Sequence, residues 1–134
     1  MSSYLNIVIP IKDKEVENSI GIVSVTASHP LYRAFSDNLN APYGRENAVE
    51  LEMSDILTVY DDINKEIEDV KKRLNEMEKH ANGNMDIINE ILSWKDYLKE
   101  KEEVYYYVKY LMSTLSTMRE DWRKNKHIFL YYYD

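Results

Sequence analysis

The sequence has no cysteine, which excludes a disulfide framework, a thiolate nucleophile and a metal site with cysteine ligands. Its three glycines, Gly21, Gly44 and Gly83, stand alone, so no glycine-rich phosphate-binding loop is present. No apolar run approaches the roughly 20 residues of a membrane-spanning helix, and the apolar stretch near the N-terminus lacks the basic flank of a signal peptide. We therefore expect no membrane contact and a cytoplasmic location.

The chain is poor in basic residues, with 17 lysines and arginines against 24 acids and a net charge of −7 that is spread thinly along it. A phosphate backbone is bound by a positive surface, so no nucleic-acid partner is expected. The length of 134 residues and the hydrophobic content of 44% suit one globular domain with its own core.

Side chains suited to catalysis or metal binding do not cluster. His29, His80 and His127 are scattered, and a metal held by Glu76 and His80 on one helix face would need two further ligands. The carboxylates within residues 61–69 alternate with lysines, as on a solvated helix face. No serine or cysteine nucleophile motif is present. We therefore predict no catalytic residue, no cofactor and no metal, and a protein that is not an enzyme.

A long helical segment over residues 84–126, free of glycine and proline, dominates the sequence. Its apolar residues recur at alternating steps of four and three, a heptad seam that keeps one stripe towards a partner helix. A second stripe makes the apolar face wider than one neighbouring helix can cover. Asn84 is the predicted N-cap. The first stripe comprises Ile87, Ile91, Trp94, Leu98, Tyr105, Val108, Met112, Leu115 and Trp122, and the second comprises Tyr97, Val104, Leu111 and Met118.

An earlier helical segment is predicted from Ser54, its expected N-cap, to the break at Asn82–Gly83, where glycine supplies the left-handed conformation of a helix end. Two heptad helices joined by so short a break form an antiparallel, coiled-coil-like hairpin. Residues whose numbers add to roughly 165 should then face each other. The facing pairs expected are Leu74 with Ile91, Ile67 with Leu98, and Tyr60 with Tyr105.

The two predicted helices differ in length. If the first begins at Asp55, it ends opposite about position 110 of the second, so the apolar residues from Leu111 to Trp122 overhang it. Each large apolar side chain left in water forgoes about 1.5–3 kcal/mol, so this end is expected to be covered. Two alternatives remain for what covers this apolar end: the chain's own N-terminal module or a partner subunit.

The N-terminal part predicts a small β module. Alternating β-branched residues over Tyr4–Ile11 and Ile20–Ala27 predict two antiparallel strands, with a bulge or a twist near Gly21. Pro10 lacks an amide donor, so it should occupy a sheet edge or a strand end. A short helix is expected after Ser28, its candidate N-cap.

Residues 48–53 alternate apolar and acidic side chains and predict a third strand, although a helix that begins at Asn47 is the alternative. The tail, residues 127–134, is rich in β-formers and could add a strand. The chain as a whole is predicted to be a single α+β domain. Its parts are a small antiparallel β module with a short helix (1–53), the long antiparallel helical hairpin (54–126), and the short C-terminal strand or tail.

Twelve tyrosines are the most unusual feature of the composition. Consecutive helical residues point about 100° apart, so the run Tyr105–Tyr107 cannot lie in one core, and at least one ring should face away from the hairpin. Exposed tyrosines are typical anchors of protein interfaces; the alternative is a core rim whose hydroxyls reach water. The predicted interface residues are Tyr106, Tyr107, Tyr110, Leu111, Met118, Trp122, Tyr131 and Tyr133.

These patterns favour a non-enzymatic protein with an interaction, structural or assembly role, which binds a protein partner or associates with itself as a homo-oligomer. The alternative is a small virus- or phage-type inhibitor or virion component that binds a host or structural protein, located in the host cytoplasm or the virion. A hydrolase or nuclease that uses carboxylates and a divalent ion is a third class, which no motif supports.

Overall fold

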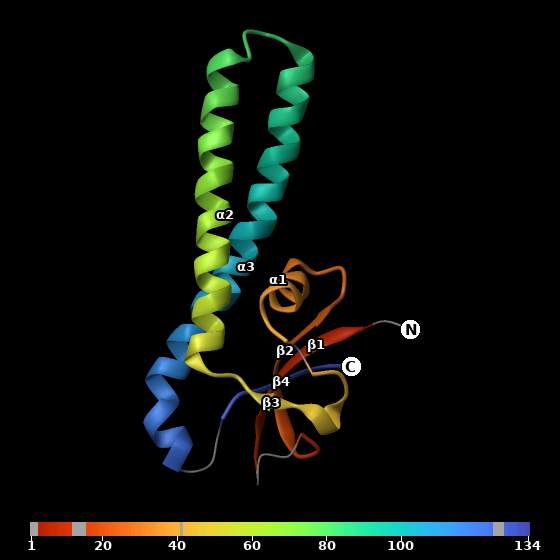
Figure 1. Cartoon of the computed structure of the whole chain (residues 1–134), viewed down its shortest axis with the longest axis vertical. Helices are drawn as coiled ribbons and strands as arrows, with labels where there is room; N and C mark the ends of the chain where they lie inside the picture. Colours follow the sequence, from red (N-terminus) through yellow and green to blue (C-terminus); the bar gives the residue numbers. More distant parts are fainter. Residues whose placement is uncertain (1–2, 12–15, 41, 125–127) are drawn as a thin grey trace.

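The computed structural model describes residues 3–11, 16–40, 42–124 and 128–134, and the side chains of 118–124 lie outside the described part. The fold is α+β, as predicted: an antiparallel sheet with a short helix carries a long pair of packed helices (Figure 1). The pair rises away from the sheet, and its second helix runs on beside the sheet at the lower end.

Four strands form one sheet in the order β2-β1-β4-β3, and every neighbouring pair is antiparallel. The strands are β1 (Tyr4–Pro10), β2 (Ser19–Thr26), β3 (Val49–Glu50) and β4 (Leu130–Tyr133). The C-terminal tail therefore forms a strand, as predicted, and the first and last strands are neighbours at the centre of the sheet. β4 is buried along its whole length, because both faces of the sheet carry a hydrophobic cluster at this strand.

The ladder between β1 and β2 contains a bulge. The register shifts between Ile7 and Val8. Opposite that step, Ile22 is the extra residue of β2 and follows Gly21, where the sequence predicts a bulge or a twist. Pro10 is the last residue of the inner strand β1, so the predicted strand end is right and the predicted sheet edge is wrong.

The short helix α1 (Pro30–Asn38) starts at a different cap from the one predicted. His29 is the N-cap, and its ring Nδ1 accepts a hydrogen bond of 3.1 Å from the backbone N–H of Leu31. Pro30 occupies the first helical turn, where its missing N–H costs nothing, and this sets the cap at the residue before it. The cap predicted at Ser28 is therefore wrong by one residue.

The first long helix, α2 (Met53–His80), also begins earlier than predicted. Glu52 is its N-cap, and the backbone N–H of Glu52 donates to Oδ2 of Asp55 at 2.9 Å, so the cap predicted at Ser54 is wrong. The helix follows a strand, as predicted, but β3 has only two residues, and the buried Leu51 separates it from the N-cap of α2.

The second long helix, α3 (Met85–Lys124), follows a tight turn. Asn82 and Gly83 have φ angles of 37° and 75°, the left-handed conformation predicted for this break. Oδ1 of Asn84 accepts a hydrogen bond of 3.0 Å from the backbone N–H of Asp86, which confirms Asn84 as the N-cap.

The antiparallel hairpin of α2 and α3 has the predicted register. The ring centroids of Tyr60 and Tyr105 lie 5.6 Å apart. Leu74 and Ile91 share a buried cluster nearer the turn. Because both predicted pairs are in place, the position of the turn fixes which residues of the two helices meet.

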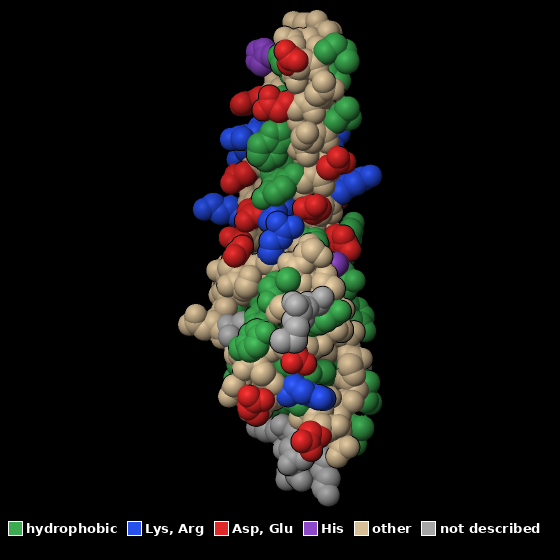
Figure 2. Space-filling view, turned by 90° about the vertical axis from the view of Figure 1, so that its right-hand side faces the viewer, with side chains coloured by type: hydrophobic (Ala, Val, Ile, Leu, Met, Phe, Trp, Pro, Cys, Tyr) green, Lys and Arg blue, Asp and Glu red, His purple; other side chains and the backbone are tan. Residues whose placement is uncertain are grey.

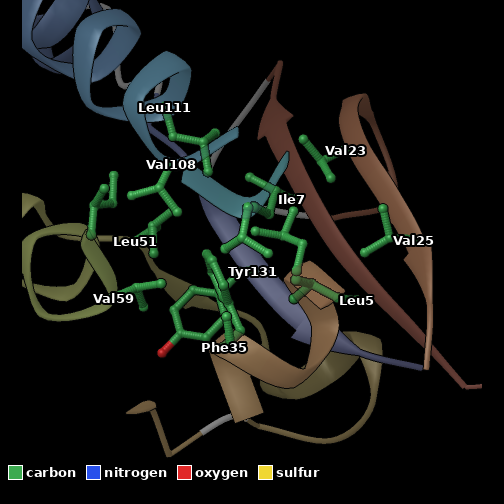
Figure 3. Packing of buried hydrophobic residues seen from close by; sticks show 14 of the residues in the cluster. Leu5, Ile7, Val23, Val25, Phe35, Leu51, Val59, Val108, Leu111 and Tyr131 are labelled. Atoms are coloured by element: carbon green, nitrogen blue, oxygen red, sulfur yellow. The ribbon is translucent and has the colours of Figure 1, made fainter. Parts of the chain in front are cut away.

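α3 is longer than α2, at 40 residues against 28, so the predicted overhang exists. The chain's own sheet module covers its first part: Val108 and Leu111 lie beside Ile7 of β1 and Tyr131 of β4 (Figure 3). The sequence left two alternatives for what covers this end of α3: the chain's own module or a partner subunit. At Val108 and Leu111 the structure shows the chain's own module. Val104 is buried in the same cluster, so the broad apolar face of α3 serves both α2 and the sheet.

Candidate protein-interaction surface

Three of the predicted interface residues form an exposed group on α3. Tyr106 and Tyr110 are 65% and 59% exposed, and Tyr107 is half-buried. Together with Glu103 they line an open, mainly apolar hollow of about 270 Å³. We refer to Glu103, Tyr106, Tyr107 and Tyr110 as the tyrosine surface.

Helical geometry explains why this group faces outwards. Val104, Val108 and Leu111 are buried against the sheet module. Each helical step turns about 100°, so a residue two positions after a buried one points to the opposite side. Tyr106 and Tyr110 therefore project into solvent from turns whose other side is fixed in the core. The tyrosine surface thus has a rigid backing.

His29, the N-cap of α1, fixes one flank of the tyrosine surface. Its Nδ1 accepts the N–H of Leu31, so in the neutral imidazole the proton is on Nε2, which donates to Oε1 of Glu103 at 3.3 Å. The same ring meets that of Tyr107 edge to face, with centroids 5.5 Å apart. A residue of another helix therefore holds two members of the tyrosine surface.

Tyr105 faces α2 and also meets the ring of Tyr106 edge to face, with centroids 5.8 Å apart. Its ring packs on Tyr60 of α2, and Nζ of Lys109 lies 5.7 Å from the centroid of that ring. The prediction that at least one ring of Tyr105–Tyr107 faces away from the hairpin is confirmed by Tyr106. The cation of Lys109 therefore lies on the Tyr105 flank of α3 and not over the tyrosine surface.

Three other predicted interface residues are buried in the chain's own core. Leu111 is fully buried, and Tyr131 and Tyr133 belong to the inner strand β4. The Tyr131 ring packs edge-on against Phe35 at 6.0 Å, and the Tyr133 ring against Tyr32 at 4.6 Å. These three side chains are almost wholly buried, so they are not part of the tyrosine surface.

The remaining two predicted interface residues, Met118 and Trp122, lie outside the described side chains. Conversely, the sequence did not single out Glu103 or His29. Glu103 could have been found, because it precedes the three tyrosines of the surface by three, four and seven positions, the spacing of one helix face. His29 had no such signal, since its contact with Glu103 spans 74 residues of chain.

A second hollow, of about 460 Å³, lies between α1 and the segment that leads to β3. Tyr133 and Tyr32 form part of its wall, and Tyr43 beside them is 68% exposed. This hollow includes one predicted interface residue against three in the tyrosine surface. Tyr43 also lies in an irregular segment, without the helical backing of Tyr106 and Tyr110.

The hairpin above the tyrosine surface has a different character. Charged side chains of both signs are dense along it, whereas hydrophobic side chains are more frequent over the sheet module (Figure 2). Nζ of Lys101 lies 2.8 Å from Oε2 of Glu66; burial alone would lower the pKa of Lys101, but this hydrogen bond and the Glu66 charge raise it overall. The Arg73 guanidinium covers the Trp94 ring at 4.7 Å. Lys101 and Arg73 are therefore engaged in contacts between the two helices of the hairpin.

Within the residues that the structure describes, no three histidine or carboxylate side chains come together as a metal-binding group. In the same part of the chain, no helix is both long enough and apolar enough to span a membrane. No family model, curated protein or solved structure matches the chain. The geometry of the tyrosine surface is therefore the observation that bears on function.

Proposed function

We propose that the chain is a protein-interaction module that binds a protein partner through the tyrosine surface. One observation carries the proposal: two large aromatic side chains, Tyr106 and Tyr110, stand exposed one turn apart on a helix whose opposite side is packed in the core. Tyrosine is enriched in the energetic centres of interfaces, because it buries a large area with few rotatable bonds.

The rigid backing supports this role energetically. Association loses affinity whenever side chains or loops must first be ordered, so a surface already fixed in place binds more tightly than a mobile one. The backbone of α3 is held by the buried Val108, and His29 holds the Tyr107 ring and the Glu103 carboxylate. Covering the two exposed rings would contribute about 2 kcal/mol each if they act as interface anchors.

The simplest form of the proposal is self-association through this surface. Light scattering across micromolar concentrations tests it: wild type should form an oligomer, and the double variant Tyr106→Ser/Tyr110→Ser should be a monomer. The matched control is Tyr43→Ser, which removes an equally exposed tyrosine from another part of the surface. It should behave as wild type. A wild type that stays monomeric removes self-association and leaves a different protein as the partner.

For a different partner, the test is stoichiometric capture from the source proteome with the wild type and the two variants as bait. Wild type and Tyr43→Ser should retain the same partner in fixed ratio, and Tyr106→Ser/Tyr110→Ser should lose it. The proposal fails if the double variant self-associates or holds its partner as wild type does while folding normally by circular dichroism.

A further inference from the structure

We infer that the tyrosine surface receives an arginine side chain of the protein partner, an inference that rests on the proposed function. The hollow is almost wholly apolar and is lined by three tyrosines and by Glu103, whose side chain ends in a carboxylate. Aromatic faces attract cations, and a carboxylate pairs with a guanidinium through two parallel hydrogen bonds. Aromatic walls with one acidic group are complementary to a side chain that has an apolar stem and a positively charged head.

The charge of Glu103 is available to such a head. The Glu103 side chain is 53% exposed, and its carboxylate accepts a hydrogen bond from His29, which is neutral when Nδ1 accepts the Leu31 N–H. Within the described part of the chain, no lysine or arginine forms an ion pair with Glu103. Glu66 on the hairpin differs in this respect, because Lys101 already pairs with it.

The orientation of the carboxylate is also set before a partner arrives. His29 is tied to α1 by its capping hydrogen bond and holds Oε1 of Glu103 at 3.3 Å. Within the described residues, the other carboxylate oxygen of Glu103 has no hydrogen bond from a protein donor. The helical cation nearest to the surface in sequence, Lys109, is held over Tyr105 and does not occupy the hollow.

Arginine fits this site better than the other common anchors. An apolar side chain would cover the Glu103 carboxylate without giving it a hydrogen-bond partner, which is costly. Lysine offers a compact, strongly hydrated charge, whereas the planar guanidinium can stack on a tyrosine ring while it pairs with the carboxylate. The net charge of −7 further favours a basic segment of a partner.

The test uses three capped tripeptides with a central arginine, lysine or citrulline between alanines, titrated into the full chain and followed by NMR shifts of the tyrosine rings. Citrulline keeps the shape of arginine and removes its charge. We expect the arginine peptide to bind with a millimolar dissociation constant and the citrulline peptide about tenfold more weakly. The lysine peptide should fall between them.

Two charge variants on α3 sharpen the test. Glu103→Gln should reduce the affinity for the arginine peptide about tenfold and leave the citrulline peptide unchanged. Glu90→Gln removes the same charge from an exposed position of the helix remote from the hollow, and should have no effect.

The outcomes separate this inference from the proposed function. Equal affinities for arginine and citrulline peptides, no binding of the arginine peptide at about 10 mM, or a Glu103→Gln variant that binds as wild type overturns the arginine site. If Tyr106→Ser/Tyr110→Ser still abolishes association with the protein partner in that case, the interaction module stands and only the arginine assignment is lost.

Discussion

His29 donates a hydrogen bond of 3.3 Å from Nε2 to Oε1 of Glu103, although 74 residues separate them in the chain. The contact joins the start of α1 to the exposed side of α3. Its donor is fixed by the second nitrogen of the same ring, which accepts the Leu31 N–H. One imidazole therefore stabilises a helix end and positions the tyrosine surface.

These two roles of His29 can be separated by substitution. His29→Ala removes both, and loss of an N-cap costs about 1 kcal/mol of unfolding free energy. His29→Asn keeps a good capping side chain, so its stability should lie within a few tenths of a kcal/mol of wild type. Urea unfolding measures both values. The NMR signals of the Tyr107 ring should shift in both variants, because both lose the edge-to-face contact with the imidazole. Equal stabilities for the two variants would contradict the capping role.

Adjacent residues of α3 should respond to substitution in opposite ways. Leu111→Ala opens a cavity in the core against the sheet and should cost about 2–5 kcal/mol of unfolding free energy. Tyr110→Ala changes an exposed side chain and should stay within about 0.5 kcal/mol of wild type. Denaturant unfolding of both variants checks this contrast. A mild effect of Leu111→Ala would show that the sheet module does not cover the overhang in solution.

Alkaline pH should destabilise the fold through the inner strand. Burial raises the pKa of the Tyr131 hydroxyl, with a smaller effect of Asp55, and burial also raises that of Tyr133. Above the unfolded value of about 10, the unfolded chain loses phenolic protons that the folded chain retains, so unfolding is favoured as pH rises. Below that pH both states keep these protons, so Tyr131 and Tyr133 contribute their full share to the free energy of unfolding.

Urea midpoints measured from about pH 8 to about pH 11 check this dependence. The double variant Tyr131→Phe/Tyr133→Phe lacks the two phenols with raised pKa, so its stability should fall less over the upper part of this range. Tyr106→Phe, which changes an exposed tyrosine, should follow wild type. A fall as steep in the β4 variant as in wild type would assign the alkaline loss to other groups.

The hairpin turn gives a test of backbone conformation alone. Gly83 has a φ of 75°, and a Cβ added there meets no atom within 4 Å, so Gly83→Ala should cost about 1 kcal/mol through strain only. Gly21 is equally open but does not have a left-handed φ, so Gly21→Ala should be neutral or slightly stabilising. Thermal unfolding of the pair measures the difference. Equal effects would contradict the left-handed turn.

The helical hairpin could be predicted from sequence because its determinants are local. Periodic apolar residues give the helices, and the break at Asn82–Gly83 sets which residues meet, as the Tyr60–Tyr105 contact shows. The caps of α1 and α2 were each misplaced by one or two residues. Several side chains near a helix start can accept a hydrogen bond, and tertiary packing chooses among them.

Part of the candidate site could also be predicted from sequence, because its determinant is local. Helical geometry alone requires that one tyrosine of the triplet face outwards, and Tyr106 does. The sequence also predicts Tyr131 and Tyr133 at the interface, because exposed tyrosines are typical interface anchors. Nothing in the tail reveals that its strand lies between β1 and β3, since those pairings join distant parts of the chain. The burial of these two side chains therefore had to come from the structure.

The pairing of Tyr4 with Asp134 has a consequence for biosynthesis. Their backbones exchange hydrogen bonds of 2.9 and 3.0 Å, so the residues around Tyr4 must wait for a strand that is synthesised much later. While the ribosome still holds Leu130–Tyr133, β1 lacks one neighbour and β3 lacks the strand it pairs with. The helices can wind before Leu130–Tyr133 are made, but β1 and β3 join into one sheet only once this strand is present between them.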